Sequence, residues 1–182
     1  YVSIPKVPFN HRIVPMNTPD QIWITDTTFR DGQQACSPFT VDQIVRLFEL
    51  LHKLGGPNGL IRQSEFFLYT DKDKQAVRRC MELGYEFPEV TSWIRANEKD
   101  FQLVKDMGVR ETGILVSCSD YHIFKKMNLN RSQAMQKYLG IVRSALEHDI
   151  LPRCHFEDIT RADFYGFVVP FANELMKLAR ES

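Results

Sequence analysis

The sequence predicts an α/β fold, specifically the first five strand–helix units of a TIM (β/α)8 barrel. Short apolar runs rich in β-branched residues alternate with longer runs of helical periodicity, and this alternation repeats five times along the chain. Each unit spans roughly 30 residues, the spacing at which about 250 residues close an eight-unit barrel. No glycine-rich phosphate loop follows the first strand, which favours a barrel over a dinucleotide-binding sheet. A complete five-stranded doubly wound domain is the alternative that the pattern alone leaves open.

The composition is that of a globular protein with a sizeable core. The chain has 182 residues, of which 43% are hydrophobic and 25% charged, so disorder is not expected. Lys plus Arg and Asp plus Glu number 23 each, which argues against nucleic acid or an anionic membrane as the main partner. No apolar run approaches membrane-spanning length, and the opening residues lack a signal-peptide pattern. We therefore expect a cytoplasmic protein.

The N-terminal part of the chain leads into the first predicted strand. Residues 1–20 carry four prolines and little periodicity, which predicts an irregular lead-in to a partial-barrel catalytic domain at 21–182. Residues 22–25 have the character of a strand buried on both faces, and Gly32 can supply the turn after it. The polar residues that follow would then lie at the C-terminal tip of the strand, where barrels of this kind bind ligands.

The remaining elements follow from caps and periodicity. Thr40 and Gln43 form a capping box for the first helix, and Asn97 caps the third. The later strands are expected at residues 59–67, 89–94, 110–116 and 151–156. The second helix is expected at 71–83, a long fourth helix carries an apolar stripe from Met135 to Leu146, and Pro170 should kink the fifth.

The four cysteines are spaced too widely for a metal or redox motif. Without a C-x-x-C pair, neither a zinc ribbon nor a dithiol site is indicated. The expectation is four buried free thiols. They are Cys36, Cys80, Cys118 and Cys154.

The polar cluster after the first strand contains groups suited to carbonyl chemistry. Asp31 offers a carboxylate ligand for Mg²⁺, Mn²⁺ or Zn²⁺. Arg30 is a poor base, but its planar guanidinium can stabilise an enolate or carboxylate oxygen. Gln34 can donate a hydrogen bond to a substrate or orient a ligand. A surface ion pair between Arg30 and Asp31 is the alternative explanation.

Residues 26–34, DTTFRDGQQ, resemble the D-x-T-L-R-D-G-x-Q signature of the DRE-TIM metallolyase (HMGL-like) superfamily. This superfamily includes 2-isopropylmalate synthase, homocitrate synthase, citramalate synthase, hydroxymethylglutaryl-CoA lyase and the carboxyltransferase domain of pyruvate carboxylase. Phe29 replaces the usual Leu and keeps that position apolar. The resemblance covers about residues 20–180.

Three later strand ends extend the resemblance. Glu65 aligns with the Glu of the superfamily name, and we expect it to fix Arg30, because a carboxylate beside a fixed guanidinium is a weak base. The fourth strand ends in a segment resembling S-x-S-D-x-H, which carries over Ser117, Ser119, Asp120 and His122. Ser119 and Asp120 are equally expected as helix caps, and His122 as a loop histidine that contacts substrate or solvent.

The fifth strand resembles the superfamily's S-x-E-D-x-x-R-T/S-D run. Arg153, His155 and Glu157 would alternate onto one face, toward the barrel interior, while Asp158 is expected to cap the next helix. Ala162 stands where the family has a hydroxyl residue. The resemblance thus implies three groups of site residues: catalytic Arg30, Glu65 and Glu157; substrate-binding Gln34, Ser119, His122, Arg153 and His155; and metal-binding Asp31.

The resemblance also implies parts that this sequence lacks. The family places two metal-binding histidines in an H-x-H motif on a later strand, and no two of the five histidines here are separated by one residue. We therefore expect a longer parent protein that completes the metal site. We also expect the chain alone to be inactive and to associate as a homodimer, because its first and fifth strands would be open edges.

The implied activity is a divalent-metal-dependent condensation of acetyl-CoA with a 2-oxo acid, as in 2-isopropylmalate or homocitrate synthase. The metal would chelate the oxo acid, and Arg30 would stabilise charge on the enolate or alkoxide. Glu157 and His155 are candidates for the base that forms the enolate. The alternatives are a carbon–carbon lyase of the hydroxymethylglutaryl-CoA lyase type, a biotin-dependent carboxyltransferase and a non-catalytic barrel fragment.

Overall fold

The computed structural model describes residues 8–9, 11–13 and 19–181, and five parallel strands form its main sheet. The strands are Ile24–Asp26 (β3), Ile61–Phe66 (β4), Glu89–Arg95 (β5), Glu111–Ser117 (β6) and Leu151–Glu157 (β7). Their spatial order, β3-β4-β5-β6-β7, follows the chain without a reversal. In a doubly wound sheet the spatial order of the strands reverses at one point, so that alternative is wrong. The predicted partial barrel is confirmed.

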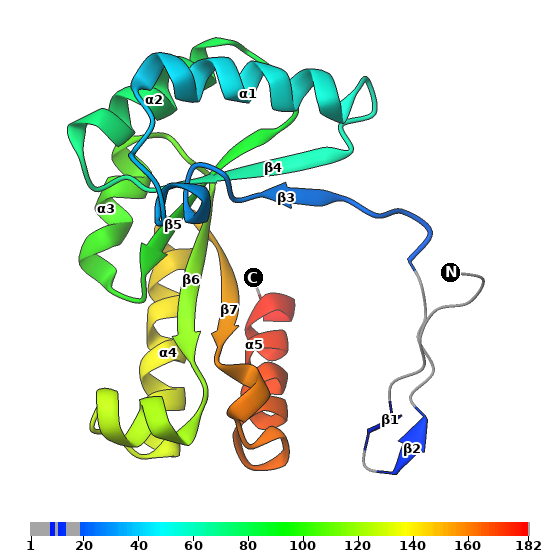
Figure 1. The fold of residues 1–182 in the computed structure, drawn as a ribbon. Coiled ribbons are helices and arrows are strands. Elements are labelled where there is room, and N and C mark those ends of the chain that lie inside the picture. Colours follow the sequence, from blue (N-terminus) through cyan, green and yellow to red (C-terminus); the bar gives the residue numbers. More distant parts are fainter. Residues whose placement is uncertain (1–7, 10, 14–18, 182) are drawn as a thin grey trace.

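A helix follows each strand and covers one face of the sheet. The helices are Val41–Gly55 (α1), Asp71–Glu82 (α2), Glu98–Asp106 (α3), Arg131–Glu147 (α4) and Val169–Glu181 (α5). In Figure 1 they succeed one another around the sheet in chain order, from α1 at the top to α5 at the lower centre, beside β7. Among the residues that the structure describes, no helix lies on the other face of the sheet.

Capping residues start the helices as predicted. The capping box of Thr40 and Gln43 is confirmed at α1, and the Asn97 side chain accepts a hydrogen bond from Lys99 N at α3. Two further boxes, which begin at Thr70 and Asn130, start α2 and α4. Four of the five α-helices therefore begin at a residue whose side chain binds the first free backbone amides.

The core between helices and sheet also anchors the loop after β3. Phe29 is only 2% exposed and stacks on Phe66 of β4 with 4.8 Å between ring centroids. Phe48 of α1 packs on the same ring at 6.0 Å. Arg30 and Asp31 directly follow Phe29, so the buried ring of Phe29 holds their backbone against the core.

The first strand differs from its prediction. The described strand is Ile24–Asp26, and Ile22, Trp23 and Ile24 are 64%, 59% and 46% exposed, so burial on both faces is wrong. The reason is topological, because β3 pairs with β4 alone and forms an edge of the sheet. Cys36 is also exposed, contrary to prediction, and Cys154 is only partly buried, whereas Cys80 and Cys118 are buried as expected.

The segment after β7 differs from its prediction in the residue that caps the helix. A π-helical turn, Phe164–Val168 (η4), runs directly into α5, so Pro170 lies in the first turn of α5. The predicted kink at Pro170 stays a prediction. The Asp158 side chain does not cap a helix; it pairs with Arg161 at 2.6 Å between Oδ1 and Nε. Asp163 is the cap instead, because its Oδ1 accepts a hydrogen bond from Gly166 N at 2.9 Å.

The N-terminal segment contains a short hairpin where an irregular lead-in was predicted. Pro8–Phe9 (β1) and Arg12–Ile13 (β2) pair antiparallel. The rest of that prediction, residues 1–7, 10 and 14–18, lies outside the described residues. Within the part of the chain that is described, no helix combines the length and the hydropathy needed to cross a membrane.

Candidate functional site

The face of the sheet away from the helices carries a cluster of charged and aromatic side chains. Side chains alternate between the two faces of a strand, and the residues that enter the apolar core, such as Ile94 and Ile114, occupy one of the two sets of positions. The other set lines the helix-free face. Together with Arg30 it forms what we call the inner cluster: Arg30, Gln63, Glu65, Trp93, Glu111, Arg153 and His155.

Arg153 of β7 is the centre of the inner cluster. Its Nη1 donates hydrogen bonds to Gln63 and Glu111, and its Nη2 donates to Glu65. Its Nε lies 3.1 Å from Nε2 of His155. One guanidinium thereby connects β4, β6 and β7, and all three of its nitrogens are in use.

Glu65 is a buried carboxylate between two guanidinium groups. It is 1% exposed; its Oε2 accepts from Arg30 Nε at 2.8 Å, and its Oε1 accepts from Arg153. The predicted ion pair with Arg30 is confirmed. Arg30 Nη2 also lies 2.8 Å from Asp31 Oδ2, so the alternative ion pair forms as well. The carboxylate of Glu65 is fully engaged in holding cations, which fits the predicted orienting role.

Trp93 packs against the Arg30 guanidinium. Its place in the site was not predicted from the sequence. The Arg30 guanidinium carbon lies 3.8 Å from the indole centroid, a cation–π contact. The indole also contacts the His155 ring, with 4.4 Å between centroids. Gly113 lies opposite Trp93 in register, and a Cβ there would stand 2.3 Å from the indole. The signal in the sequence is therefore a Trp and a Gly at paired positions, which can be recognised only once the register is known.

His155 is held neutral by its surroundings. Burial lowers the pKa of its imidazole to about 4, with further contributions from the charges of Arg153 and Arg30. Glu65 Oε1, the nearest carboxylate oxygen, is 3.9 Å from Nε2. The ring is 37% exposed, so a ligand on the helix-free face can reach it.

A second group of polar side chains lies at the C-terminal tips of β6 and β7. Glu157 Oε2 accepts a hydrogen bond from Ser117 Oγ at 2.5 Å and lies 3.7 Å from Lys126 Nζ. His122 Nδ1 is 3.3 Å from the same oxygen, but the geometry is not that of a hydrogen bond, so this contact is electrostatic and requires a protonated ring. His122 belongs to the π-helix Tyr121–Lys126 (η2), not to a loop as predicted.

The structure does not bring the remaining predicted residues into the inner cluster. Ser119 is buried and accepts a hydrogen bond from His122 N at 3.3 Å, as expected of a helix cap. Asp120 makes no capping bond and binds Arg131 through both oxygens, which lowers the pKa of Asp120. Gln34 is exposed, and its neighbour Gln33 stabilises the loop by bonding to the backbone.

Asp31 is the only predicted metal ligand, and the described residues do not complete a site around it. Its side chain is 47% exposed, and one oxygen is paired with Arg30. In the ranges that the structure describes, no three His, Cys, Asp or Glu side chains lie close enough together to hold a metal ion. A single hard carboxylate suits a divalent ion chemically but does not amount to a metal centre.

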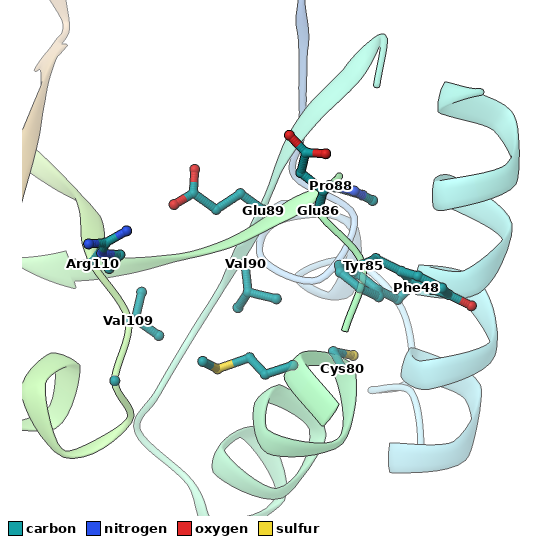
Figure 2. A pocket seen from close by; sticks show the side chains of 11 residues that line it. Phe48, Cys80, Tyr85, Glu86, Pro88, Glu89, Val90, Val109 and Arg110 are labelled. Carbon is teal, nitrogen blue, oxygen red and sulfur yellow. The ribbon is translucent and has the colours of Figure 1, made fainter. Parts of the chain in front are cut away.

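A pocket at the opposite end of the strands has a different character. It has a volume of about 210 Å³ and lies where β5 and β6 begin; Figure 2 shows Phe48 and Tyr85 on one side of it. Burial raises the pKa of the Cys80 thiol, at the same pocket, to about 12, so this thiol is not a nucleophile at neutral pH. The amino ends of barrel strands serve stability rather than catalysis.

Comparisons with known proteins identify the family of the chain and agree with its fold. A family model described as HMGL-like matches residues 21–179. The chain is 62% identical to a Citrate (Re)-synthase from Clostridium kluyveri over 182 residues, which are 100% of this chain and 40% of that protein. It is 30% identical to a 2-isopropylmalate synthase from Sulfurisphaera tokodaii over 144 residues, 79% of this chain and 36% of that protein. The chain thus spans about two fifths of the length of these curated relatives.

Among solved structures, a hydroxymethylglutaryl-CoA lyase from Bacillus subtilis superposes with a TM-score of 0.63 at 14% identity. The superposition covers 89% of this chain and 56% of that one. At this identity the likeness shows the fold alone, a partial barrel.

Proposed function

Because the chain belongs to the HMGL-like family, we propose that the protein condenses acetyl-CoA with a 2-oxo acid, and specifically with oxaloacetate to form citrate. The observation that carries the proposal is the 62% identity, over the whole chain, to a citrate-forming synthase. Identity to a 2-isopropylmalate synthase is half as high, so an oxo acid with a second carboxylate is a better candidate than one with an apolar branch.

The proposed reaction joins the methyl carbon of the acetyl group to the keto carbon of the oxo acid. A base removes a methyl proton to form the enolate, the enolate attacks the carbonyl, and the resulting alkoxide takes up a proton. Water then cleaves the thioester and releases CoA. Negative charge develops first on the enolate oxygen and then on the alkoxide, so the reaction needs fixed donors at these two positions.

Arg30 is the group in this chain best placed to stabilise that charge. It follows the tip of β3, its side chain is only 15% exposed, and Glu65 and Trp93 hold it from two directions. A guanidinium held in this way needs little reorganisation when charge develops, which is the condition for a large contribution to rate. Glu65 acts by positioning Arg30 and not by proton transfer.

The remaining roles concern Asp31 and Glu157, whose assignments rest on the family resemblance more than on contacts within the described residues. Asp31 is proposed as a ligand for Mg²⁺, Mn²⁺ or Zn²⁺, and a bound ion would polarise the keto group of the oxo acid. No step is assigned to the ion, since the described residues supply one carboxylate. Glu157, beside Ser117, is the candidate for the base on this chain.

The proposal can be tested by transplantation. The matching segment of the Clostridium kluyveri synthase would be exchanged for this chain, and CoA release from acetyl-CoA would be measured with oxaloacetate, 2-oxoglutarate and 2-oxoisovalerate. The proposal predicts CoA release and citrate formation with oxaloacetate, both lost in an Arg30→Ala chimera of unchanged circular dichroism. A folded chimera that is active only with 2-oxoisovalerate would contradict it.

A further inference from the structure

We propose that Arg131 is a positioning residue, which holds two π-helical turns together beyond the tips of β6 and β7 and so keeps Lys126 beside Glu157. The positioning rests on contacts among the described residues alone. Its effect on catalysis rests, in addition, on the proposed function, in which Glu157 is the candidate base.

The two π-helical turns follow neighbouring strands of the sheet. η2, Tyr121–Lys126, comes after β6, and η4, Phe164–Val168, comes after β7. An aspartate precedes each turn, Asp120 for η2 and Asp163 for η4. π-helical turns are rare and occur frequently at functional sites. The carboxyl ends of barrel strands are also where ligands bind, so the placement of these turns bears on the site.

Arg131 connects the aspartates that precede the two turns. It is the first residue of α4, and its Nε and Nη2 donate to Oδ1 and Oδ2 of Asp120 at 2.8 and 2.7 Å. Its Nη1 donates to Asp163 Oδ2 at 2.7 Å. The other oxygen of Asp163 accepts from Gly166 N, inside η4, at 2.9 Å. The rigid fork of one guanidinium thus binds both aspartates, and we call Arg131, Asp120 and Asp163 the clasp.

The residue at position 166 is fitted to the clasp. A Cβ on Gly166 would stand 2.5 Å from Arg131 Nη1 and even closer to Asp163 Oδ2, which is too short for a real contact. Any other residue there would push these two side chains apart. Glycine allows η4 to lie directly against the ion pair.

Without the guanidinium the two aspartates would repel each other. Hydrogen bonds from Arg131 lower the pKa of Asp120, while the negative charge of Asp163 opposes this shift. Both carboxylates therefore face one shared cation. Removal of that cation leaves two like charges in front of the two turns, so η2 and η4 should loosen together.

The clasp bears on the site because η2 carries a cation that faces the end of β7. Lys126, the last residue of η2, has its Nζ 3.7 Å from Glu157 Oε2, and His122 Nδ1 lies 3.3 Å from the same oxygen. Glu157 itself ends β7 and is bound by Ser117 of β6. The strands alone fix the contact with Ser117, whereas the contact with Lys126 depends on where η2 lies.

The positioning can be measured on the unmodified chain without a ligand. A carbodiimide joins a carboxylate to an amine without a spacer, so it links Lys126 to Glu157 only where the two side chains meet, and peptide mass spectrometry gives the yield. Arg131→Gln keeps a good helix former and should lower this yield by about threefold or more, the scale of partly exposed ion pairs. Arg79→Gln is the matched control, because it breaks an exposed pair with Asp42 between α2 and α1. An unchanged yield in Arg131→Gln, or an equal fall in the control, would overturn the inference.

Gly166→Ala tests the clasp without removing a charge. The added methyl group should separate Arg131 from Asp163, so amide hydrogen exchange should become faster in both η2 and η4. Gly140→Ala in α4, where a Cβ meets nothing within 4 Å, should change neither turn. Faster exchange confined to η4 would overturn the inference, because strain within that turn alone would explain it.

The effect on catalysis is tested in the transplanted synthase. Arg131→Gln should lower kcat by about threefold or more with little change in the KM for acetyl-CoA, and Arg131→Lys should not restore kcat, because an ammonium lacks the fork that binds two carboxylates. An unchanged kcat, in a chimera whose yield of the Lys126–Glu157 link has fallen, would overturn the catalytic effect. If the parent chimera forms no citrate, the proposed function fails, and the linking and exchange experiments still decide whether Arg131 positions Lys126.

Discussion

The two faces of the main sheet carry different side chains, which contribute to the protein in different ways. On β4, Phe66 packs against Phe29 and Phe48 in the core, while Glu65 on the opposite face binds two guanidinium groups. Burial of apolar area is the main source of folding free energy, whereas a buried ion pair contributes little net stability although breaking it is costly. The difference teaches that substitutions on the helix side should lower stability through lost apolar burial, whereas those on the helix-free side should lower stability by breaking buried contacts of charged groups and should also change ligand binding.

Phe29→Ala should give the largest loss of stability. The ring is 2% exposed and stacks on Phe66, so truncation leaves a cavity and should cost about 3–5 kcal/mol. Denaturant unfolding followed by circular dichroism measures it. Phe29→Leu is the matched control and should cost much less, because it keeps most of the apolar volume; equal losses would mean that the ring does not anchor the loop.

Arg153→Met should rank next. The substitution removes the second cation from buried Glu65 and the donor to Glu111, and breaking a buried pair in this way costs about 3–5 kcal/mol before relaxation. Adding Glu65→Gln removes a carboxylate that has lost one of its two cations, so the double variant should be more stable than Arg153→Met alone. If the two substitutions instead destabilise additively in unfolding experiments, Arg153 and Glu65 are not coupled.

Gly113→Ala adds one methyl group next to the Trp93 indole and so tests whether Trp93 positions Arg30. The added Cβ would stand 2.3 Å from the Trp93 indole and force it to move, at a cost of about 1–3 kcal/mol. Because Trp93 underlies Arg30, oxaloacetate binding should weaken as well. Gly140→Ala is the control, since a Cβ there meets nothing within 4 Å. Unchanged binding in Gly113→Ala would show that Trp93 does not position Arg30.

The smallest effect is a pH dependence from His155. Its folded-state pKa of about 4 lies below the ordinary value of 6.5, so between these values the unfolded chain binds more protons. The contribution of His155 to stability is therefore complete above pH 6.5 and is lost as the pH falls toward 4. Unfolding free energies measured across this window should slope less steeply in His155→Asn. An identical slope would show that the imidazole is not held neutral.

The sequence predicts most of the fold because its signals are local. Capping residues such as Thr40 and Asn97 and the apolar stripes of the helices lie within a few residues of one another, so they can be recognised without tertiary information. The exposure of Ile22 and Trp23 could not be recognised in this way, because it depends on which strand ends the sheet. The predicted homodimer, which would cover such edges, remains a prediction.

The site was predictable where a motif contains both partners, or where strand alternation places side chains on one face, as for Arg153 and His155. Arg30 and Glu65 belong to one signature, and their ion pair is confirmed. The contact between Trp93 and Gly113 depends on strand register, and the helix cap lies at Asp163 instead of Asp158 because the chain turns through a left-handed residue at Asp158. Which residue caps a helix, and which residues face each other across two strands, depends on packing, so a local sequence pattern does not predict it.

The most direct test of the account is Arg30→Lys in the transplanted synthase, with activity and stability measured on the same sample. Lysine keeps the charge but loses the planar guanidinium that Glu65 and Trp93 hold in place. The account predicts a fall in kcat for CoA release of roughly 10² or more, the scale of one lost preorganised donor, with a much smaller change in unfolding free energy. A near-normal kcat, or a loss of activity fully explained by unfolding, would contradict it.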